Sequence, residues 1–138
     1  MQIALTTPDP GRDALAAFGP PAGPTSPASA RERQLAFLVS TWLAASAHRV
    51  APADLSLMRR GSGDVVAARQ LAIYLVHVVF GFDRDCTAKL FGRDRRTVAR
   101  ACAKLEDQRE SAEAERTLCA IEREALALAE TLGLEPRA

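Results

Sequence analysis

The chain has 138 residues, of which 48% are hydrophobic and 25% charged, and its formal net charge is +1. It is long enough for one compact domain and a tail. No apolar run approaches the roughly 18 residues that span a membrane, and the N-terminus lacks the pattern of a secretory signal peptide, so we expect a cytoplasmic protein without a membrane partner. Alanine and leucine dominate while aromatic residues make up only 5%, which predicts an all-α fold.

The small net charge hides an uneven distribution along the chain. Residues 59–104 contain ten lysines and arginines against four acids, whereas residues 105–138 contain four arginines against nine acids. A basic middle and an acidic end favour a module that binds a polyanion, followed by a C-terminal segment with another role.

Residues 1–28 contain six of the eight prolines, with glycine and small polar residues between many of them. Such a composition buries too little apolar surface to fold, so we expect a disordered or extended tail. The run 13–18 could form one helical turn against a protein partner, although a passive tail is the simpler expectation. A compact helical domain is then expected over residues 29–138.

The first helix is predicted over about residues 30–47, with Trp42 as an anchor in the core and His48 near the C-terminal end. The apolar stripe that predicts this helix consists of Leu35, Leu38, Val39, Trp42 and Leu43.

Pro52 can open a short helix that ends near Leu57. The basic loop that follows, residues 59–64, contains two arginines and two glycines. Arg59 and Arg60 could reach a phosphate or a minor groove, or the loop could be an ordinary exposed turn.

A long apolar helix is predicted over about residues 65–80, and it is apolar enough to be the central helix of the core. Gly81 follows it, at a position that favours left-handed backbone. Asp83 should cap a short helix that ends near Leu90, and residues 91–93 turn the chain into the next helix.

Asp94 is the expected N-cap of that next helix, which has two different faces. Its apolar face consists of Val98, Ala101, Cys102 and Leu105. Roughly opposite lie Arg96, Arg100 and Ala103, flanked by Arg93 and Lys104. Together with the short helix and the turn before it, this pattern predicts a helix-turn-helix whose second helix lies in a DNA groove, with a merely solvated cationic surface as the alternative.

The last helix is predicted by a second apolar stripe, which most of its acidic residues avoid. This stripe consists of Leu118, Ile121, Ala125, Leu128 and Leu132. The helix either packs back on the domain or offers residues 113–132 to a second copy or a partner protein.

We expect neither an enzyme nor a cofactor. The three cysteines, Cys86, Cys102 and Cys119, show no metal-binding spacing, and no nucleotide-binding phosphate loop occurs. His77 lies on the predicted core helix, where a structural or phosphate-side role is simpler than a catalytic one.

The segment from about residue 50 to 110 resembles the C-terminal DNA-binding domain of the bacterial replication initiator DnaA. The resemblance rests on Arg69-Gln70-Leu71-Ala72-Ile73-Tyr74-Leu75 and, about twenty residues later, on Arg93-Asp94-Arg95-Arg96-Thr97-Val98. Because the initiator's ATPase is missing, the whole chain is similar instead to small stand-alone alphaproteobacterial proteins with this helix-turn-helix. Some of these regulate transcription, including activators of gene transfer agent clusters.

The resemblance implies binding to double-stranded DNA. The residues implied to read bases are Asp94, Arg95, Arg96 and Thr97. Those implied to contact phosphates or the minor groove are Arg59, Arg60, Arg69, Arg93, Arg100 and Lys104, with bracing of the motif as an alternative for Arg69 and Arg93. The family usually has His-Thr-Thr where this chain has Arg95-Arg96-Thr97, so we expect a different base preference, toward guanine.

The leading hypothesis is therefore a sequence-specific transcription regulator that acts on the nucleoid, alone or with a partner protein. One alternative is an adaptor that binds another protein through residues 1–28 or the last helix and has a weak or non-specific DNA-binding domain. Another is a modulator of replication initiation that competes for initiator sites. Salt-dependent DNA affinity separates the DNA-binding hypotheses from the adaptor.

Overall fold

The computed structural model describes residues 28–56 and 61–136. This part of the chain is all-helical, as the composition predicts, and contains no strand. Its elements are α1 (Ala30–His48), the 3-10 helix η2 (Pro52–Ser56), α2 (Gly63–Tyr74), the π-helical segment η3 (Leu75–Val79), α3 (Arg84–Phe91), α4 (Arg95–Gln108) and α5 (Ala112–Leu132). Apart from Ala28, the expected tail lies outside the described residues, as does the expected end of the short helix at Leu57.

Each of the five α-helices in this part of the chain begins at a side chain that accepts a hydrogen bond from a backbone amide three residues later. These caps are Ser29, Ser62, Asp83, Asp94 and Ser111. The two predicted caps are confirmed, with 2.7 Å from the Cys86 amide to Asp83 Oδ1 and 2.8 Å from the Thr97 amide to Asp94 Oδ1. Such caps satisfy amides that have no partner within the helix, so these helix starts are fixed locally by sequence.

The prediction that Trp42 anchors the core is wrong. Its side chain is 58% exposed, and Leu38 from the same predicted stripe is 49% exposed. The buried side of α1 instead combines Val39 and Leu43 with a row of small residues, Ala36, Ser40 and Ala44, all fully buried. Leu38 and Trp42 each follow one of these small residues by two positions, which places them on the outer side of the helix.

The long central helix lies where the sequence predicts it, but its last turn is not α-helical. Every residue from Leu71 to Val76 is buried, and the last turn is π-helical, with the Phe80 amide donating to the Leu75 carbonyl at 2.9 Å. Because a π turn holds one extra residue, the chain leaves this helix in a different direction from a regular α-helix. Gly81 then adopts the expected left-handed backbone at φ 80°, and His77 Nδ1 donates to the Phe82 carbonyl at 2.6 Å, which is a structural role.

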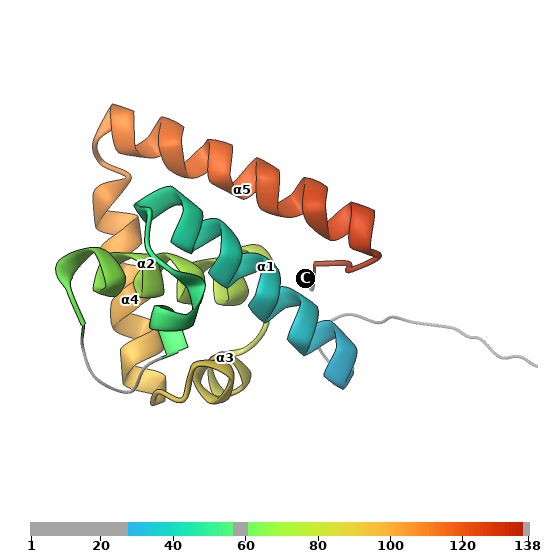
Figure 1. The fold of residues 1–138 in the computed structure, drawn as a ribbon. Coiled ribbons are helices and arrows are strands. Elements are labelled where there is room, and N and C mark those ends of the chain that lie inside the picture. The colour runs from blue at the N-terminus through green and yellow to red at the C-terminus, as the bar shows by residue number, and fades with distance from the viewer. Residues whose placement is uncertain (1–27, 57–60, 137–138) are drawn as a thin grey trace, which may run out of the picture.

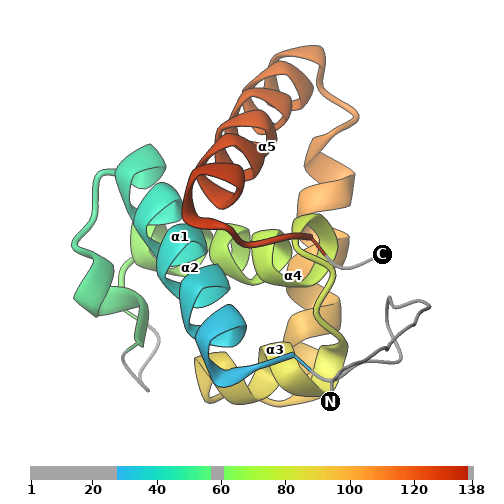
Figure 2. The same cartoon turned by 90° about the vertical axis from the view of Figure 1, so that its right-hand side faces the viewer.

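The helices are arranged around α2 and α4, which pack against each other. Figures 1 and 2 show α3 at one end of α4 and α5 at the other. The N-terminal end of α4, which begins directly after α3 and a three-residue turn, is thus far from the helix that closes the fold.

The last helix packs back on the domain, the first of the two alternatives that the sequence left open. Leu118, Ala125 and Ala129 of α5 are buried in the core, and α5 contacts α1 and η3. Leu132, predicted to belong to this buried stripe, is 40% exposed. The helix ends there at Gly133, and Leu134 turns back into the core instead, at 2% exposure.

Arg109 joins three helices just after the end of α4. Its Nε lies 2.6 Å from Glu115 Oε1, and its two terminal nitrogens lie 2.9 and 3.2 Å from the carboxylate oxygens of Glu122. The guanidinium also donates to the hydroxyl of Tyr74, which is itself 3.1 Å from Glu122 Oε2. Because Tyr74 belongs to α2 and both acids belong to α5, one side chain fixes α2, α4 and α5 relative to each other.

We predict that Tyr74 ionises only at high pH in the folded protein. Burial and the Glu122 carboxylate raise its pKa to about 12. A raised pKa favours the neutral phenol in the folded state, so the contribution of Tyr74 to the free energy of unfolding is complete below about pH 10 and is lost as the pH rises toward 12.

Tyrosinate absorbance can test this directly, because the chain contains one tyrosine. Between about pH 10 and 11 the folded chain should show little tyrosinate, whereas the chain unfolded in denaturant should titrate near 10. Circular dichroism would confirm that the helices persist. A folded chain that titrates near 10 would contradict the Tyr74 environment described here.

The two glycines at the start of α2 should respond oppositely to alanine. Gly61 has φ +81°, and an added Cβ would lie 3.0 Å from Val65 Cγ1, whereas nothing lies within 4 Å of a Cβ added at Gly63. Chemical denaturation should show Gly61→Ala losing about 1–2 kcal/mol of unfolding free energy, and Gly63→Ala unchanged or gaining up to about 1 kcal/mol. Equal losses in both variants would count against this geometry.

Candidate nucleic-acid interface

The two faces of α4 are separated as the sequence predicts. Val98, Ala101 and Leu105 are 0%, 2% and 7% exposed, and they pack in the common core. Cys102 is half-buried beside them, and burial raises the pKa of its thiol to about 11, so it stays protonated and inert at neutral pH. This apolar side leaves the opposite side of the helix to solvent.

The solvent side carries a row of cations. We define the cationic face as Arg93 in the turn before α4 together with Arg96, Arg100 and Lys104. The three residues on the helix itself are exposed, and Arg93 is partly exposed. With a rise of 1.5 Å per residue, the row from Arg96 to Lys104 extends about 12 Å along the helix axis. Small side chains between the cations, such as the exposed Ala103, leave room for close approach of a ligand.

Asp94 holds the start of this face in place. Its carboxylate accepts hydrogen bonds from both the amide and the hydroxyl of Thr97, and these bonds hold the pKa of Asp94 below its usual 3.8. Arg96 and Arg100 act in the same direction. The first turn is therefore ordered without any ligand, with the Asp94 and Thr97 side chains bound to each other.

Arg95 points to α3 rather than along the cationic face. Its Nε lies 3.0 Å from Asp85 Oδ1, and the two side chains are 66% and 65% exposed. An ion pair this exposed is worth at most about 1 kcal/mol, so a competing anion can separate it easily. Sequence analysis missed Asp85 as a partner because the pairing depends on how α3 and α4 cross.

A groove of about 570 Å³ runs between α2 and α4, next to the cationic face. Arg93, Arg100 and Thr97 line it. Arg69 lies at its floor but is only 6% exposed, and its guanidinium donates to the backbone carbonyls of Leu55 at 2.9 Å and Asp54 at 3.3 Å. The resemblance implied that Arg69 either contacts phosphate or braces the motif. Its geometry supports the bracing role, because its side chain connects α2 to η2.

Lys89 is a further cation that sequence analysis did not include among the site residues. It lines a surface depression of about 420 Å³ together with Arg93, Arg95 and Arg96, where α3 meets the start of α4. Its position in the last turn of the short helix, one turn before Arg93, is the signal that could have identified it.

Arg59 and Arg60, the two arginines of the predicted basic loop, lie outside the described residues. In the described segments no group of histidine, cysteine and acidic side chains is arranged to hold a metal ion. None of the helices in those segments has the length and apolarity needed to cross a membrane.

Comparison with protein-family models and with curated proteins gave no match. The resemblance to the DnaA domain therefore rests on the two sequence motifs.

Because of the Asp94 cap, the free energy of unfolding should decrease at acidic pH. Because its pKa is lowered in the folded state, its contribution is fully present above about pH 4 and is lost as the pH falls through the lowered value. Asp94→Ser keeps a capping oxygen without the charge, so this variant should be less stable than the wild type at neutral pH and equal to it in strong acid. Thermal unfolding between about pH 2 and 7 measures this, and a difference that stays constant with pH would contradict the account.

Proposed function

We propose that the protein binds double-stranded DNA by laying the cationic face of α4 in the major groove. The observation that carries this proposal is that one helix combines a buried apolar side, a capped first turn and three exposed cations, Arg96, Arg100 and Lys104, on the opposite side. A helix of this kind fits the major groove, and cations at its edges meet the phosphates on either side.

The proposed roles follow from position. Arg95 and Arg96 reach base edges, where an arginine fork favours O6 and N7 of guanine. Thr97 lies beside them and can contact a thymine methyl, whereas the Asp94 carboxylate offers an acceptor for a cytosine amino group. The phosphate contacts are assigned to Lys89, Arg93, Arg100 and Lys104.

Arg69 is left out of these contacts because its guanidinium already serves two backbone carbonyls. Arg59 and Arg60 keep their predicted minor-groove role, on the resemblance alone.

The resemblance supports the same proposal from a different direction. In the DnaA family the segment that corresponds to residues 93–98 reads the major groove. In this chain the segment lies in the turn between α3 and α4 and in the first turn of α4, a position that supports the proposed helix-turn-helix. We accordingly propose a sequence-specific transcription regulator of the bacterial nucleoid, related to the stand-alone DnaA-like proteins.

The adaptor hypothesis is supported by one separate observation. Leu38 and Trp42 lie on the outer side of α1 at 49% and 58% exposure, and exposed tryptophan is typical of protein interfaces. An adaptor would keep its protein partner when the cationic face is removed. The third hypothesis, competition for initiator sites, makes the same DNA contacts and differs only in which sequence is bound.

The experiment is to incubate the purified protein with fragmented DNA from its source cell and sequence what is retained. Wild type should enrich a short motif that is rich in guanine opposite the arginines, and Arg95→Ala/Arg96→Ala should lose that enrichment. The matched control is Arg116→Ala/Arg123→Ala, which removes two exposed arginines from α5. Each good bidentate contact is worth about 1–3 kcal/mol, so loss of two should weaken binding of the motif about thirtyfold to about ten-thousandfold, and the control should bind like wild type.

Retention without a motif, equal in both variants and abolished by moderate salt, would overturn sequence-specific binding. The adaptor hypothesis would then lead.

A second prediction concerns the ion pair of Arg95. Asp85→Asn removes a negative charge from the proposed interface and releases Arg95, so DNA affinity should rise about two- to tenfold, most strongly at low salt. Fluorescence anisotropy with a labelled duplex measures this, and Glu130→Gln on α5 is the control of equal charge change. A lower affinity in Asp85→Asn would show that the pair helps to position Arg95 for DNA.

A further inference from the structure

A pocket of about 330 Å³ lies between α1, α2, α4 and α5, where α4 ends and α5 begins. Its floor is apolar and comes from three helices, with Leu71 of α2, Leu105 of α4 and Leu118 of α5. A volume of this size is at the lower end of the range for small-molecule sites and suits a single ring with a short side chain.

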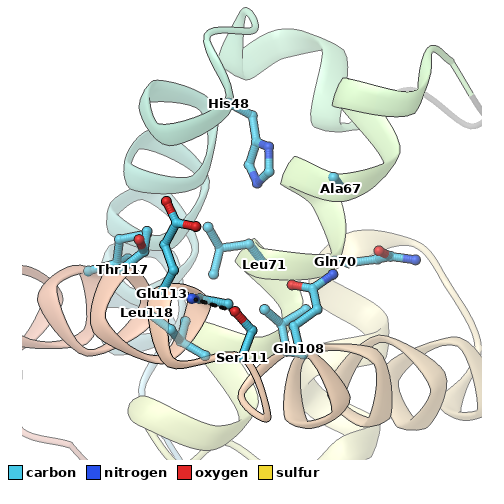
Figure 3. Close-up of a pocket in the computed structure, with 12 residues that line it drawn as sticks. His48, Ala67, Gln70, Leu71, Gln108, Ser111, Glu113, Thr117 and Leu118 are labelled. Atoms are coloured by element: carbon cyan, nitrogen blue, oxygen red, sulfur yellow. Dashed lines mark hydrogen bonds between the residues drawn. The ribbon is translucent and has the colours of Figure 1, made fainter.

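The rim of the pocket is polar, and three of its polar side chains have no partner within the described residues. Figure 3 shows the His48 ring, from the end of α1, and the Glu113 carboxylate, from the start of α5, extending toward the same space. The Gln108 amide lies at another edge. In residues 28–56 and 61–136 none of these three side chains has a hydrogen bond or ion pair, whereas neighbouring Ser111 is occupied as the cap of α5.

The charges at the rim favour a cation. Among the described residues that line the pocket, Glu113 has the one carboxylate. None of these residues is a lysine or an arginine, and His48 is the other titratable group. The α5 N-terminus contributes a partial positive charge, but Glu113 and Glu115 in its first turn oppose it. An apolar floor below a single carboxylate is complementary to an apolar body that carries one ammonium group.

We propose that this pocket binds a small apolar amine, with the ring on the leucine floor and the ammonium group at Glu113. The pocket shares no residue with the cationic face, and this proposal does not depend on DNA binding. A ligand in it would contact α1, α2, α4 and α5 at once, so it would stabilise the packing of the closing helix against the rest of the fold.

The test uses the full chain, labelled with ¹⁵N, and two probes of similar shape and opposite charge, 2-phenylethylamine and 3-phenylpropionate. The amine should give saturable shifts at the amides of Leu71, Gln108, Glu113 and Leu118. The carboxylate should give none there.

Two variants locate the charge. Glu113→Gln should weaken binding of the amine at least about fivefold, while Glu124→Gln, an exposed glutamate of the same helix that does not line the pocket, should leave binding unchanged. Both positions are exposed, so neither change removes core packing.

Three results would overturn the proposal. The first is shifts that are spread over the acidic surface without saturation. The second is equal binding of the two probes, and the third is a Glu113→Gln variant that binds the amine as tightly as wild type.

Discussion

The fold depends on one arginine that serves three helices. Arg109 follows α4 directly, and its guanidinium meets a tyrosine of α2 and two glutamates of α5. Without it, the half-buried carboxylate of Glu122 and the hydroxyl of Tyr74 would lack their charged partner, which is costly away from water. Because Glu122 accepts from two guanidinium nitrogens, lysine could not replace Arg109 with the same geometry.

This contact explains how α4 can present a row of cations to solvent. Like charges on one side of a helix repel each other and favour disorder, so such a helix needs support from the rest of the fold. The Asp94 cap holds the start of α4, and the Arg109 cluster holds its other end. Between them, Val98, Ala101 and Leu105 are buried in the core. The exposed cations of α4 are thereby held at the surface, where a polyanion can bind them.

The features of the fold and of the candidate site that depend on local interactions could be predicted from the sequence. The caps at Asp83 and Asp94 bond to amides three residues away, so short patterns specify them. The prediction for Trp42 failed because helical spacing of large apolar residues does not reveal that small residues, Ala36, Ser40 and Ala44, occupy part of the buried side. Sequence patterns do not reveal the Arg109 cluster because Glu122 and Tyr74 lie 13 and 35 residues away from Arg109. The groove and the 330 Å³ pocket also depend on the packing of distant segments, which periodicity does not describe.

The central claim is that the free side of α4, beginning in the turn at Gly92, is the surface that meets DNA. Adding a short duplex to the ¹⁵N-labelled protein and mapping the amide shifts tests it most directly. The account predicts the largest shifts over residues 92–104 and in the last turn of α3, with α5 nearly unchanged. Shifts concentrated on α5 or around Trp42, or a spectrum that does not respond to duplex at low salt, would contradict it.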